Sequence, residues 1–592
     1  MLEYLKEIIY ILGKDKRKTP LILMFFVLIS MLEVVGIGLI APYVALIIDQ
    51  STPVEKFSWV FNILGLDGDY QLAVILLGCL LLIIFIIKAV SSIWINKIIV
   101  FFSQNQQVKL RSYLMHAYQN ISYEEYLHRN SSEYVRNIQE TTGQFSGGVL
   151  LPLLRLVSDS IVSIFIIILL AYQDIVALTS LVMLVGIFAY SYDKFFRYKL
   201  KDYGNIANAS AASIVKAVNE GIEGLKEIRI YNKEQYFYNI VNKNSKKFAY
   251  SNSMKQVISS APRYLLEAVA IGFVVSLVII SSMSESSLDG ILPTLSIFAI
   301  ASIRLIPSFN VILTSILNLR YGRNSVSILY KDLKNLKKIK TIEAAKKTKL
   351  NNELFQSFEL ERVNYSYPFS TERALSNISL KFLPGESIGI VGPSGSGKTT
   401  LVDLILGLVV PQSGSVLYNK RTLALSLNVW RSKIAYIPQK ILLIDDTLRK
   451  NIALGIPENE IDDRKIQDSI KRAMLSEVVE KMPIGVGTVI GERGTLLSGG
   501  QMQRVALARA FYHDRSVLIM DESTSALDSE MESEVVEQMR FLHGVMTIIV
   551  IAHRVTTLKY CDRIIKIDNG EILTELPYKR YVELIKTQSG VL

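Results

Sequence analysis

The stretch that decides the fold of the C-terminal part of this chain is Gly392-Pro-Ser-Gly-Ser-Gly-Lys-Thr399. It follows an apolar run that predicts a buried strand, Ser387–Val391, and precedes a run that predicts a helix, Thr400–Leu406. A glycine-rich loop between a strand and a helix is the P-loop pattern. Its backbone N–H groups curl around phosphate oxygens, and the start of the helix adds partial positive charge. The sequence therefore predicts an α/β domain with a phosphate-binding loop.

Two side chains of this loop complete the predicted phosphate site. Lys398 supplies a full positive charge at the β- and γ-phosphates of a nucleotide, and the Thr399 hydroxyl can ligate Mg²⁺. A chance glycine turn is the alternative interpretation, and the flanking strand and helix argue against it.

A second element ends in two acids. The apolar run Val517–Met520 predicts a strand, and Asp521 and Glu522 follow it directly. Asp521 can hold the water shell of Mg²⁺, and Glu522 can act as the general base on an attacking water. Two acids after a strand are weak evidence alone, but downstream of a P-loop they indicate nucleotide hydrolysis.

A third element is Leu497-Ser-Gly-Gly-Gln501, followed by the helical run Gln503–Arg509. Two glycines at a helix start again offer backbone N–H groups to a phosphate. The P-loop, this pentapeptide, the pair Asp521-Glu522 and His553 occur in a fixed order. Together they resemble the ATP-binding cassette (ABC) transporter family over essentially the whole chain, and the pentapeptide is the signature of that family.

The resemblance implies roles for further residues. Gln439, in Tyr436-Ile-Pro-Gln439, matches the glutamine that contacts Mg²⁺ and senses the membrane domain. Asp528 matches the acid that couples two nucleotide sites, and His553 matches the switch histidine that reaches the γ-phosphate.

Two more segments match the family. Tyr367 matches the aromatic residue that stacks on adenine, although Tyr365 is close enough to compete. Gly491-Glu-Arg-Gly494 resembles the exporter-specific loop that touches the cytoplasmic helix tips.

The candidate residues fall into sets by their implied role. The expected catalytic residues are Glu522, His553 and Gln439. The expected Mg²⁺ ligands are Thr399, Gln439 and Asp521. ATP is expected to contact Tyr367, Gly392, Ser394, Gly395, Ser396, Gly397, Lys398, Thr399, Thr400, Ser498, Gly499, Gly500, Gln501 and Asp528.

The resemblance also implies a second subunit. In this family two cassettes pair head to tail, and each ATP lies between Lys398 of one cassette and Ser498 of the other. This chain has one cassette, and none of its motifs departs from the active pattern. A homodimer with two-fold symmetry is the simple solution.

The N-terminal part of the chain holds long apolar runs. A membrane-spanning helix needs about 20 apolar residues. Six runs reach that length, at approximately 21–48, 72–99, 149–171, 175–195, 264–283 and 290–318. The first run is too long for a signal peptide and lacks a clear cleavage site, so we expect it to remain as a membrane helix.

The distribution of Lys and Arg predicts the orientation of these spans. The short outward links contain one lysine, Lys56, whereas the long links 100–148 and 196–263 are rich in Lys and Arg. The positive-inside rule places the long links and both termini in the cytoplasm. Together with the family resemblance, this predicts an integral protein of a bacterial inner membrane with a cytoplasmic cassette. Such loops explain the net charge of +11, so we expect no nucleic-acid partner. Cys79 and Cys561 form no disulfide framework.

Helical patterns continue through the long links and beyond the membrane. Polar and aromatic turns lie at their middles, at Ser122–Tyr126 and Ile230–Glu234. These turns are either solvated helix tips or docking surfaces for the cassette, and the presence of a cassette favours docking. We expect a six-helix transmembrane domain of the exporter type at 1–340, a linker at 341–357 and an α/β P-loop ATP-binding cassette at 358–592.

Three classes of function can use an ATP-binding cassette. A soluble-type cassette ATPase acting on nucleic acid or ribosomes conflicts with six spans. An ATP-gated channel is not excluded, but the sequence has no long regulatory insert. Fusion of the membrane domain and the cassette in one chain favours an exporter or flippase over an importer.

Ionisable side chains inside the spans bear on the substrate, since they are costly there and often functional. They are Glu33, Lys88, Glu267 and Arg304, with Arg263 near the inner end of the fifth span. In one interpretation they pair, with Arg263 and Arg304 neutralising Glu267 and Glu33. In the other, Lys88, Arg263 and Arg304 form a basic belt that attracts an anionic headgroup such as a pyrophosphate.

A closer resemblance supports the belt. Ala261–Glu267, Gly290–Phe298 and Arg304–Asn310 are similar to flippases of lipid-linked oligosaccharides from bacterial protein-glycosylation pathways. Glu33 and a basic residue at position 88 fit the same pattern, with Lys where Arg is expected. The implied substrate is a polyprenyl-diphosphate oligosaccharide, flipped from the cytoplasmic to the outer leaflet. Other amphipathic lipids, peptides or drugs are the alternative.

Overall fold

The computed structural model describes residues 2–48, 70–173, 175–283, 292–338, 353–368, 370, 372–491, 494–521, 536–537, 539–552 and 554–588. The chain divides into two compact units: the first is Met1–Ile121 with Arg129–Lys340, and the second is Ser122–His128 with Thr341–Leu592. Ser122–His128 comes from the first long link of the N-terminal part and nevertheless belongs to the second unit.

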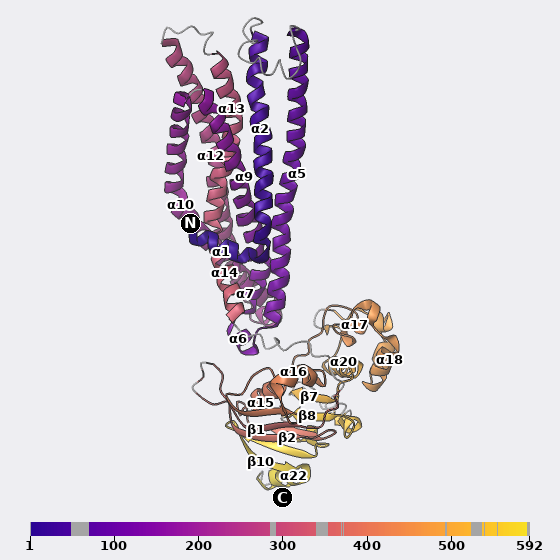
Figure 1. The fold of residues 1–592 in the computed structure, drawn as a ribbon. Helices are drawn as coiled ribbons and strands as arrows, with labels where there is room; N and C mark the ends of the chain where they lie inside the picture. Colours follow the sequence, from indigo (N-terminus) through magenta and orange to yellow (C-terminus); the bar gives the residue numbers. More distant parts are fainter. Residues whose placement is uncertain are drawn as a thin grey trace. The chain divides into compact units, whose positions relative to one another are not determined.

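Long helices make up the first unit (Figure 1). In its described part they are α2 (Thr19–Ile48), α5 (Tyr70–Gln119), α9 (Leu151–Gln173), α10 (Ile175–Glu223), α12 (Glu234–Met283) and α13 (Leu292–Tyr321). Each predicted span falls on one of these helices, except that 149–150 belong to η3 (Ser146–Leu150) and 290–291 lie outside the described residues. Within the described residues, three helical stretches are long and apolar enough to cross a membrane: Glu3–Leu39, Val74–Gln119 and Ser131–Ala171.

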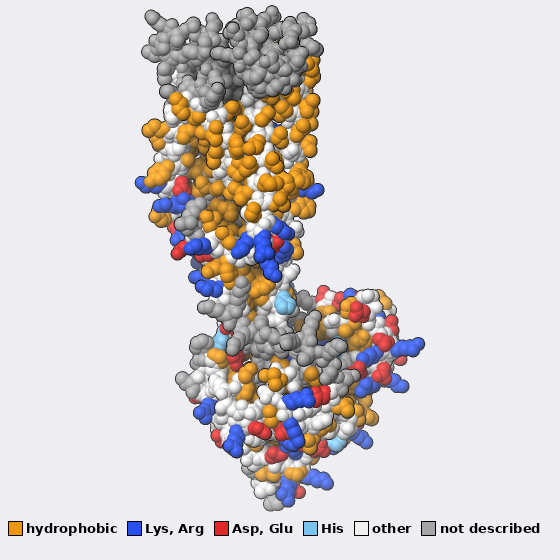
Figure 2. Space-filling view, in the orientation of Figure 1, with side chains coloured by type: hydrophobic (Ala, Val, Ile, Leu, Met, Phe, Trp, Pro, Cys, Tyr) orange, Lys and Arg blue, Asp and Glu red, His pale blue; other side chains and the backbone are white. Residues whose placement is uncertain are grey.

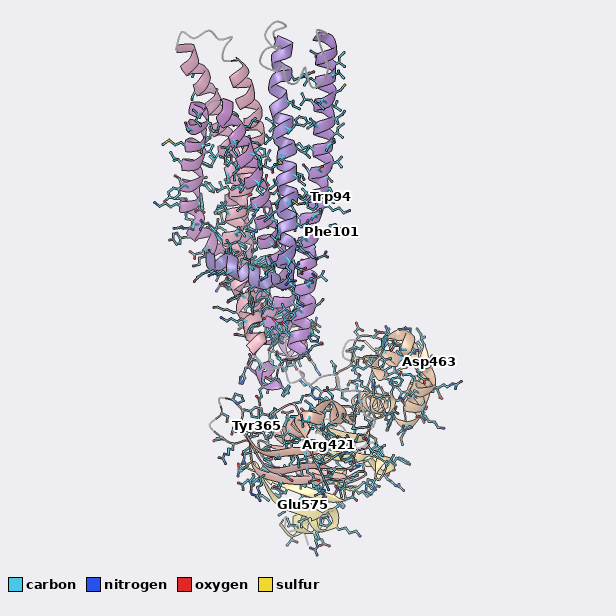
Figure 3. All side chains as sticks on the ribbon, viewed as in Figure 1. Trp94, Phe101, Tyr365, Arg421, Asp463 and Glu575 are labelled. Atoms are coloured by element: carbon cyan, nitrogen blue, oxygen red, sulfur yellow. The ribbon has the colours of Figure 1, made fainter. Side chains whose placement is uncertain are left out.

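α5 shows that the helices extend beyond a membrane. It has 50 residues, which is about 75 Å at 1.5 Å per residue, whereas the hydrocarbon core is about 30 Å thick. Its exposed aromatic side chains include Trp94 and Phe101 (Figure 3). The predicted second turn is also confirmed: α11 (Leu225–Ile230) ends and α12 begins on its two sides, and Asn232 between them has a φ of 51°.

Shorter elements join these helices: α1 (Leu2–Leu12), η1 (Gly13–Lys18), α7 (Ser131–Arg136), η2 (Asn137–Thr141), α8 (Thr142–Phe145), η3 (Ser146–Leu150) and α14 (Arg323–Lys338). The turns η2 and η3 are π-helical. A buried carboxylate, Asp332 in α14, accepts hydrogen bonds from Arg129 at 2.6 Å, Asn137 at 3.2 Å and Tyr118. Because a buried charge is costly unless it is paired, this cluster holds α14 against α5 and η2.

The second unit contains two sheets. The four-stranded antiparallel sheet has the order β2-β1-β4-β5, and the six-stranded sheet has the order β10-β9-β3-β8-β7-β6. The strands are β1 (Phe358–Tyr365), β2 (Leu375–Phe382), β3 (Ser387–Val391), β4 (Ser413–Tyr418), β5 (Arg421–Thr422), β6 (Ile434–Ile437), β7 (Val517–Asp521), β8 (Thr547–Ile551), β9 (Arg563–Asp568) and β10 (Glu571–Pro577). Every residue of β3, β7 and β8 is buried, as in parallel strands covered on both faces.

The second unit also contains shorter helices. They are α6 (Tyr123–His128), α15 (Lys398–Ile405), α16 (Leu423–Arg431), α17 (Leu448–Ile452), η5 (Glu458–Glu460), α18 (Asp463–Arg472), α19 (Ser476–Glu480), η6 (Gly485–Gly487), α20 (Gly499–Tyr512), η8 (Val555–Leu558) and α22 (Tyr578–Gln588). Of these, α16, α20 and α22 pack against strands. Because β3, β8, β7 and β6 are parallel neighbours, their carboxyl ends meet at one edge. Ligands of such sheets bind outside that edge.

Candidate functional site

Two glycines of the P-loop lie too close to neighbouring backbone for any side chain. A Cβ on Gly392 would lie 2.1 Å from the carbonyl oxygen of Ile567, and a Cβ on Gly397 would lie 2.6 Å from that of Ala374. Gly397 also has a φ of 101°, in the left-handed region that favours glycine. The loop therefore packs tightly against β9 and the segment before β2, as the sequence predicts for a phosphate-binding loop.

Two polar side chains of the loop are buried. Lys398 is 5% exposed, and its Nζ donates to the carbonyl oxygens of Gly392 at 2.9 Å and Pro393 at 2.8 Å. Ser396 Oγ has no hydrogen-bond partner among the described residues. A buried polar atom without a partner is costly. A phosphate would give Lys398 a counter-charge and give Ser396 an acceptor, so the loop fits the phosphates of ATP.

Three oxygen donors lie along the same edge of the sheet. Thr399 is in the first turn of α15, Asp521 ends β7, and Gln439 follows β6 by two residues. Hydroxyl, carboxylate and amide oxygens suit Mg²⁺, which usually takes one or two carboxylates together with phosphate oxygens. Within the described part of the chain, no group of three or more His, Cys, Asp or Glu side chains offers another metal site.

Two carboxylates, Asp521 and Asp403, bring negative charge to one side of the site. Tyr436 donates a hydrogen bond from its hydroxyl to Asp521 Oδ2 at 3.2 Å. Burial, and then the charge of Asp521, raises the pKa of Tyr436 above its ordinary value. Burial, with the charge of Asp521 as a smaller contribution, raises the pKa of Asp403 in α15 to about 6. A divalent cation would neutralise this charge, so the donors fit Mg²⁺.

Tyr365 and Tyr367 lie side by side at the end of β1, with ring centroids 5.1 Å apart. Tyr365, labelled in Figure 3, is 1% exposed, and its hydroxyl donates to Glu124 Oε1 at 2.8 Å. Tyr367 is half-buried, and its hydroxyl oxygen lies 3.3 Å from Thr400 Oγ1 and 3.4 Å from Asp403 Oδ2. Tyr367 thus lies beside the P-loop helix, whereas the ring of Tyr365 is enclosed in the core.

Ser498 is the N-cap of α20, whose first residues are Gly499 and Gly500. Its Oγ accepts a hydrogen bond from the Gln501 backbone N at 3.3 Å, and Gln501 Oε1 accepts one from the Ser498 backbone N at 2.9 Å. This capping box satisfies two N–H groups at the helix start. The signature pentapeptide therefore has a structural role within one chain, and its two glycines leave the helix start without bulky side chains.

Comparison with known families agrees with these geometries. Residues 375–525 match the family described as ABC transporter, and residues 20–305 match the family described as ABC transporter transmembrane region. The two matches together cover well over half of the chain and fall on both units. The chain belongs to the ABC transporters.

Curated relatives are similar to part of this ABC transporter. It is 43% identical over 214 residues to the ATP-dependent lipid A-core flippase of Cupriavidus pinatubonensis, with 36% of each chain covered. It is 32% identical over 372 residues to the ATP-dependent lipid A-core flippase of Bordetella pertussis, with 62% of this chain and 58% of the relative covered. The matches thus span between 36% and 58% of the length of these relatives.

A solved structure shows the same architecture. A bacterial Atm1-family ABC exporter with ATP bound matches with a TM-score of 0.75 at 19% identity, covering 95% of this chain and 96% of that chain. The ABC transporter therefore has the exporter fold, a membrane helical domain fused to an α/β cassette, as the sequence predicts.

Several predicted site residues of this ABC transporter lie outside the described residues. They are Glu522, Asp528 and His553, together with Glu492 and Arg493 of the loop Gly491–Gly494. Their roles remain predictions from the sequence.

Two of the three cations predicted to form the basic belt have carboxylate partners. Lys88 Nζ lies 2.8 Å from Glu33 Oε1, and Glu33 is 1% exposed. Arg263 Nε lies 3.1 Å from Glu267 Oε1, the pair that their spacing of four residues suggests. The side chain of Arg304, in α13, lies outside the described part of the structure.

Sequence reasoning missed Tyr436 and Asp403 as neighbours of Asp521. Tyr436 opens the segment that contains Gln439, and Asp403 lies one helical turn after Thr399. These short separations from predicted site residues could have indicated both neighbours. The sequence predicts a docking surface for the cassette around Ser122–Tyr126. Its assignment to the second unit, and the hydrogen bond from Tyr365 to this segment, support the docking interpretation.

Proposed function

We propose that this chain is one half of an ATP-driven flippase, which works as a homodimer in a bacterial inner membrane. The carrying observation is the edge of the six-stranded sheet, where the P-loop, Asp521 and Gln439 follow neighbouring parallel strands. The same chain contains a bundle of apolar helices, so one polypeptide combines a nucleotide-binding domain with a transmembrane domain.

The proposed hydrolysis step uses groups at this edge. Lys398 and the P-loop N–H groups bind the phosphates, and Ser396 Oγ gains the acceptor that it lacks. Thr399, Gln439 and Asp521 would hold Mg²⁺, which supplies charge neutralisation at the β- and γ-phosphates.

The attacking water needs a base and the γ-phosphate needs a donor. Glu522 would take the proton from the water, and His553 would donate to the γ-phosphate. The signature residue Ser498 would complete the site of a second copy, which makes the homodimer the working unit.

The proposed substrate is a lipid, and within that class a polyprenyl-diphosphate oligosaccharide moved from the cytoplasmic to the outer leaflet. The relatives named as lipid A-core flippases favour a lipid over peptides or drugs. A lipid of the lipid A-core type is accordingly the alternative, together with other amphipathic cargo.

Lys88, Arg263 and Arg304 are the proposed headgroup contacts. The bond between Lys88 and Glu33 balances one negative charge with one positive charge inside the bundle. A diphosphate carries more charge than one carboxylate and accepts several charge-assisted hydrogen bonds, so it can compete for Lys88. Arg263 is 65% exposed at its side chain and is available to the same headgroup despite its bond to Glu267.

The test is transport in vesicles that contain the purified protein. Labelled polyprenyl-diphosphate oligosaccharide and lipid A-core are supplied in separate preparations, and the lipid reaching the opposite leaflet is measured with and without ATP. We expect ATP-dependent movement of the glycan lipid and none with the Lys398→Ala variant. Movement of lipid A-core alone would establish the alternative substrate, and ATP hydrolysis without movement of any lipid would contradict the flippase.

A further inference from the structure

A cavity of about 340 Å³ lies in the first unit between α1, α10, α13 and α14. Its lining includes six aromatic or basic side chains: Tyr4, Arg197, Tyr198, Lys201, Arg320 and Arg323. The volume is within the ordinary range of small-molecule pockets, which begins at about 300 Å³.

Two of the four basic side chains are held by carboxylates. Arg320 Nη2 lies 2.6 Å from Asp193 Oδ2, and Arg323 binds both carboxylate oxygens of Glu7, at 2.5 and 3.2 Å. These bonds fix the two guanidinium groups at the wall of the cavity. They also balance the charge of the groups they hold.

Arg197 and Lys201, both on α10, are not balanced in this way. Among the described residues neither has a carboxylate partner within ion-pair distance. Arg197 Nη2 donates to the Tyr198 hydroxyl at 3.3 Å, while Arg197 Nε is buried without a hydrogen-bond partner. Glu3 also lines the cavity and offsets one of these two positive charges, which leaves the other in excess. The cavity therefore keeps a positive charge and an unused donor.

The position of the cavity along the bundle indicates the membrane surface. Exposed side chains along α10 change from apolar to a mixture of aromatic and basic: Met183 and Ile187 are followed by Tyr190, Lys194, Phe195, Tyr198, Lys199 and Lys201. Aromatic side chains gather at the membrane–water interface, and Lys and Arg gather on its cytoplasmic side. Figure 2 shows the same change on the visible face of the first unit, where hydrophobic side chains give way to Lys and Arg.

We propose that this cavity binds the phosphate-bearing headgroup of an anionic phospholipid from the cytoplasmic leaflet. Arg197 would donate hydrogen bonds to phosphate oxygens, and Lys201 would add a point charge. Ile316 and Leu319 line the same cavity and offer an apolar wall to the glycerol and first methylene groups. Basic pockets between membrane helices on the cytoplasmic side suit such headgroups.

The lipid in this proposal is a component of the bilayer rather than the transported molecule. The proposal rests on the proposed orientation of the membrane domain but not on the identity of the substrate. It also places lipid recognition on α1, α10, α13 and α14, away from Lys88 on α5.

The experiment titrates the purified full chain in detergent with phosphatidylglycerol and, separately, with phosphatidylcholine of the same acyl chains. Bound lipid is counted by native mass spectrometry. We expect the protein to prefer phosphatidylglycerol. The double variant Arg197→Gln with Lys201→Gln should bind this lipid about 30-fold more weakly, because it loses the attraction of two cations near the membrane surface. The charge-preserving variant Arg197→Lys with Lys201→Arg should keep most of the preference.

The matched control is Lys194→Gln with Lys199→Gln, which removes two exposed cations from the same helix outside the cavity lining. An equal loss in this control would mean general surface charge and would overturn the site. Displacement of the lipid by millimolar inorganic phosphate would mean a soluble-anion site, and preferred binding of polyprenyl diphosphate would mean a substrate site. If the double variant fails to fold, Lys201→Gln alone, at an exposed position, should still lose about fivefold.

Discussion

Ser396 and Lys398 lie two residues apart in the P-loop, yet their surroundings differ. Lys398 Nζ already has two carbonyl acceptors within the loop, whereas Ser396 Oγ has none in the described structure. The backbone of the loop packs closely against its neighbours at Gly392 and Gly397, where no side chain fits, so the loop has its phosphate-binding shape before ATP binds. The hydroxyl of Ser396 gains a hydrogen-bond acceptor, and Lys398 gains a counter-charge, only when phosphate oxygens bind.

Hydrolysis should depend on Glu522. We expect Glu522→Gln to keep ATP binding and to reduce turnover by a factor of about 10²–10⁴, the usual cost of losing one proton acceptor. ATPase assays and nucleotide-binding titrations of the same preparation measure the two effects. Near-normal turnover would remove Glu522 from the role of general base.

For single residues, the sequence predicted the members of short motifs well, but it predicted contacts between distant segments poorly. Gly392, Lys398 and Asp521 were identified because each belongs to a short motif with its own chemistry. The bond from Tyr436 to Asp521 joins two strands that are far apart in the chain, so no local pattern contains it. The bond from Lys88 to Glu33 was missed for the same reason, because it joins two different helices.

α6 is the element that ties a link of the membrane domain to the cassette. Tyr123 packs against the core of the second unit, and Glu124 accepts the hydrogen bond from buried Tyr365. A helix of six residues has little stability of its own, so these contacts hold it in place.

We expect Tyr365→Phe to keep basal ATP hydrolysis and to lower the amount of lipid moved per ATP hydrolysed. The variant keeps the buried ring and loses one hydrogen bond to a charged group, worth about 1.5–3 kcal/mol. Transport and hydrolysis are measured together in vesicles. Glu125→Gln is the control, since it removes a charge from the same helix; an equal fall in that variant would contradict a specific role for the bond.

The ion pair between Glu33 of α2 and Lys88 of α5 should contribute to the stability of the bundle. Lys88→Gln removes the cation that lies 2.8 Å from buried Glu33, which should destabilise the protein by up to about 3–5 kcal/mol. Adding Glu33→Gln should restore the melting temperature in detergent, and Lys97→Gln, at an exposed position of α5, should change it little.

The double variant also separates the two interpretations of Lys88. If Lys88 binds the substrate headgroup, stability returns without transport. If transport returns as well, the pair serves only the fold, and the basic belt is wrong at this position.

Among the elements, the long helices were predictable because apolar runs above the membrane length leave few alternatives. The turn at Asn232 was predictable from polar residues at the middle of a link. The π-helical turns η2 and η3 were not, because their contacts come from distant segments: Ser146 of η3 exchanges hydrogen bonds with Ser103, and Asn137 of η2 donates to Asp332.

For the whole molecule, the prediction concerns pairing of two copies. A chain with Lys398→Ala is mixed with a chain with Ser498→Arg, and heterodimers are isolated with two different tags. If ATP lies between Lys398 of one copy and Ser498 of the other, one site of each heterodimer carries both defects and the other is intact. We expect the heterodimer to bind more ATP than either homodimer, as measured by nucleotide titration. Binding by the heterodimer at the average of the two homodimers would show that each cassette works alone.

The assignment of Ser122–His128 to the second unit also has a consequence for biosynthesis. Glu124 and Tyr365 are 241 positions apart in the chain. A ribosome adds about 5–20 residues per second, so α6 emerges on the order of 10–50 s before its partner. During that interval its apolar side chains have no cassette to pack against. A nascent chain stalled before the P-loop is translated should therefore expose this segment to chaperones and proteases, and the completed cassette should protect it.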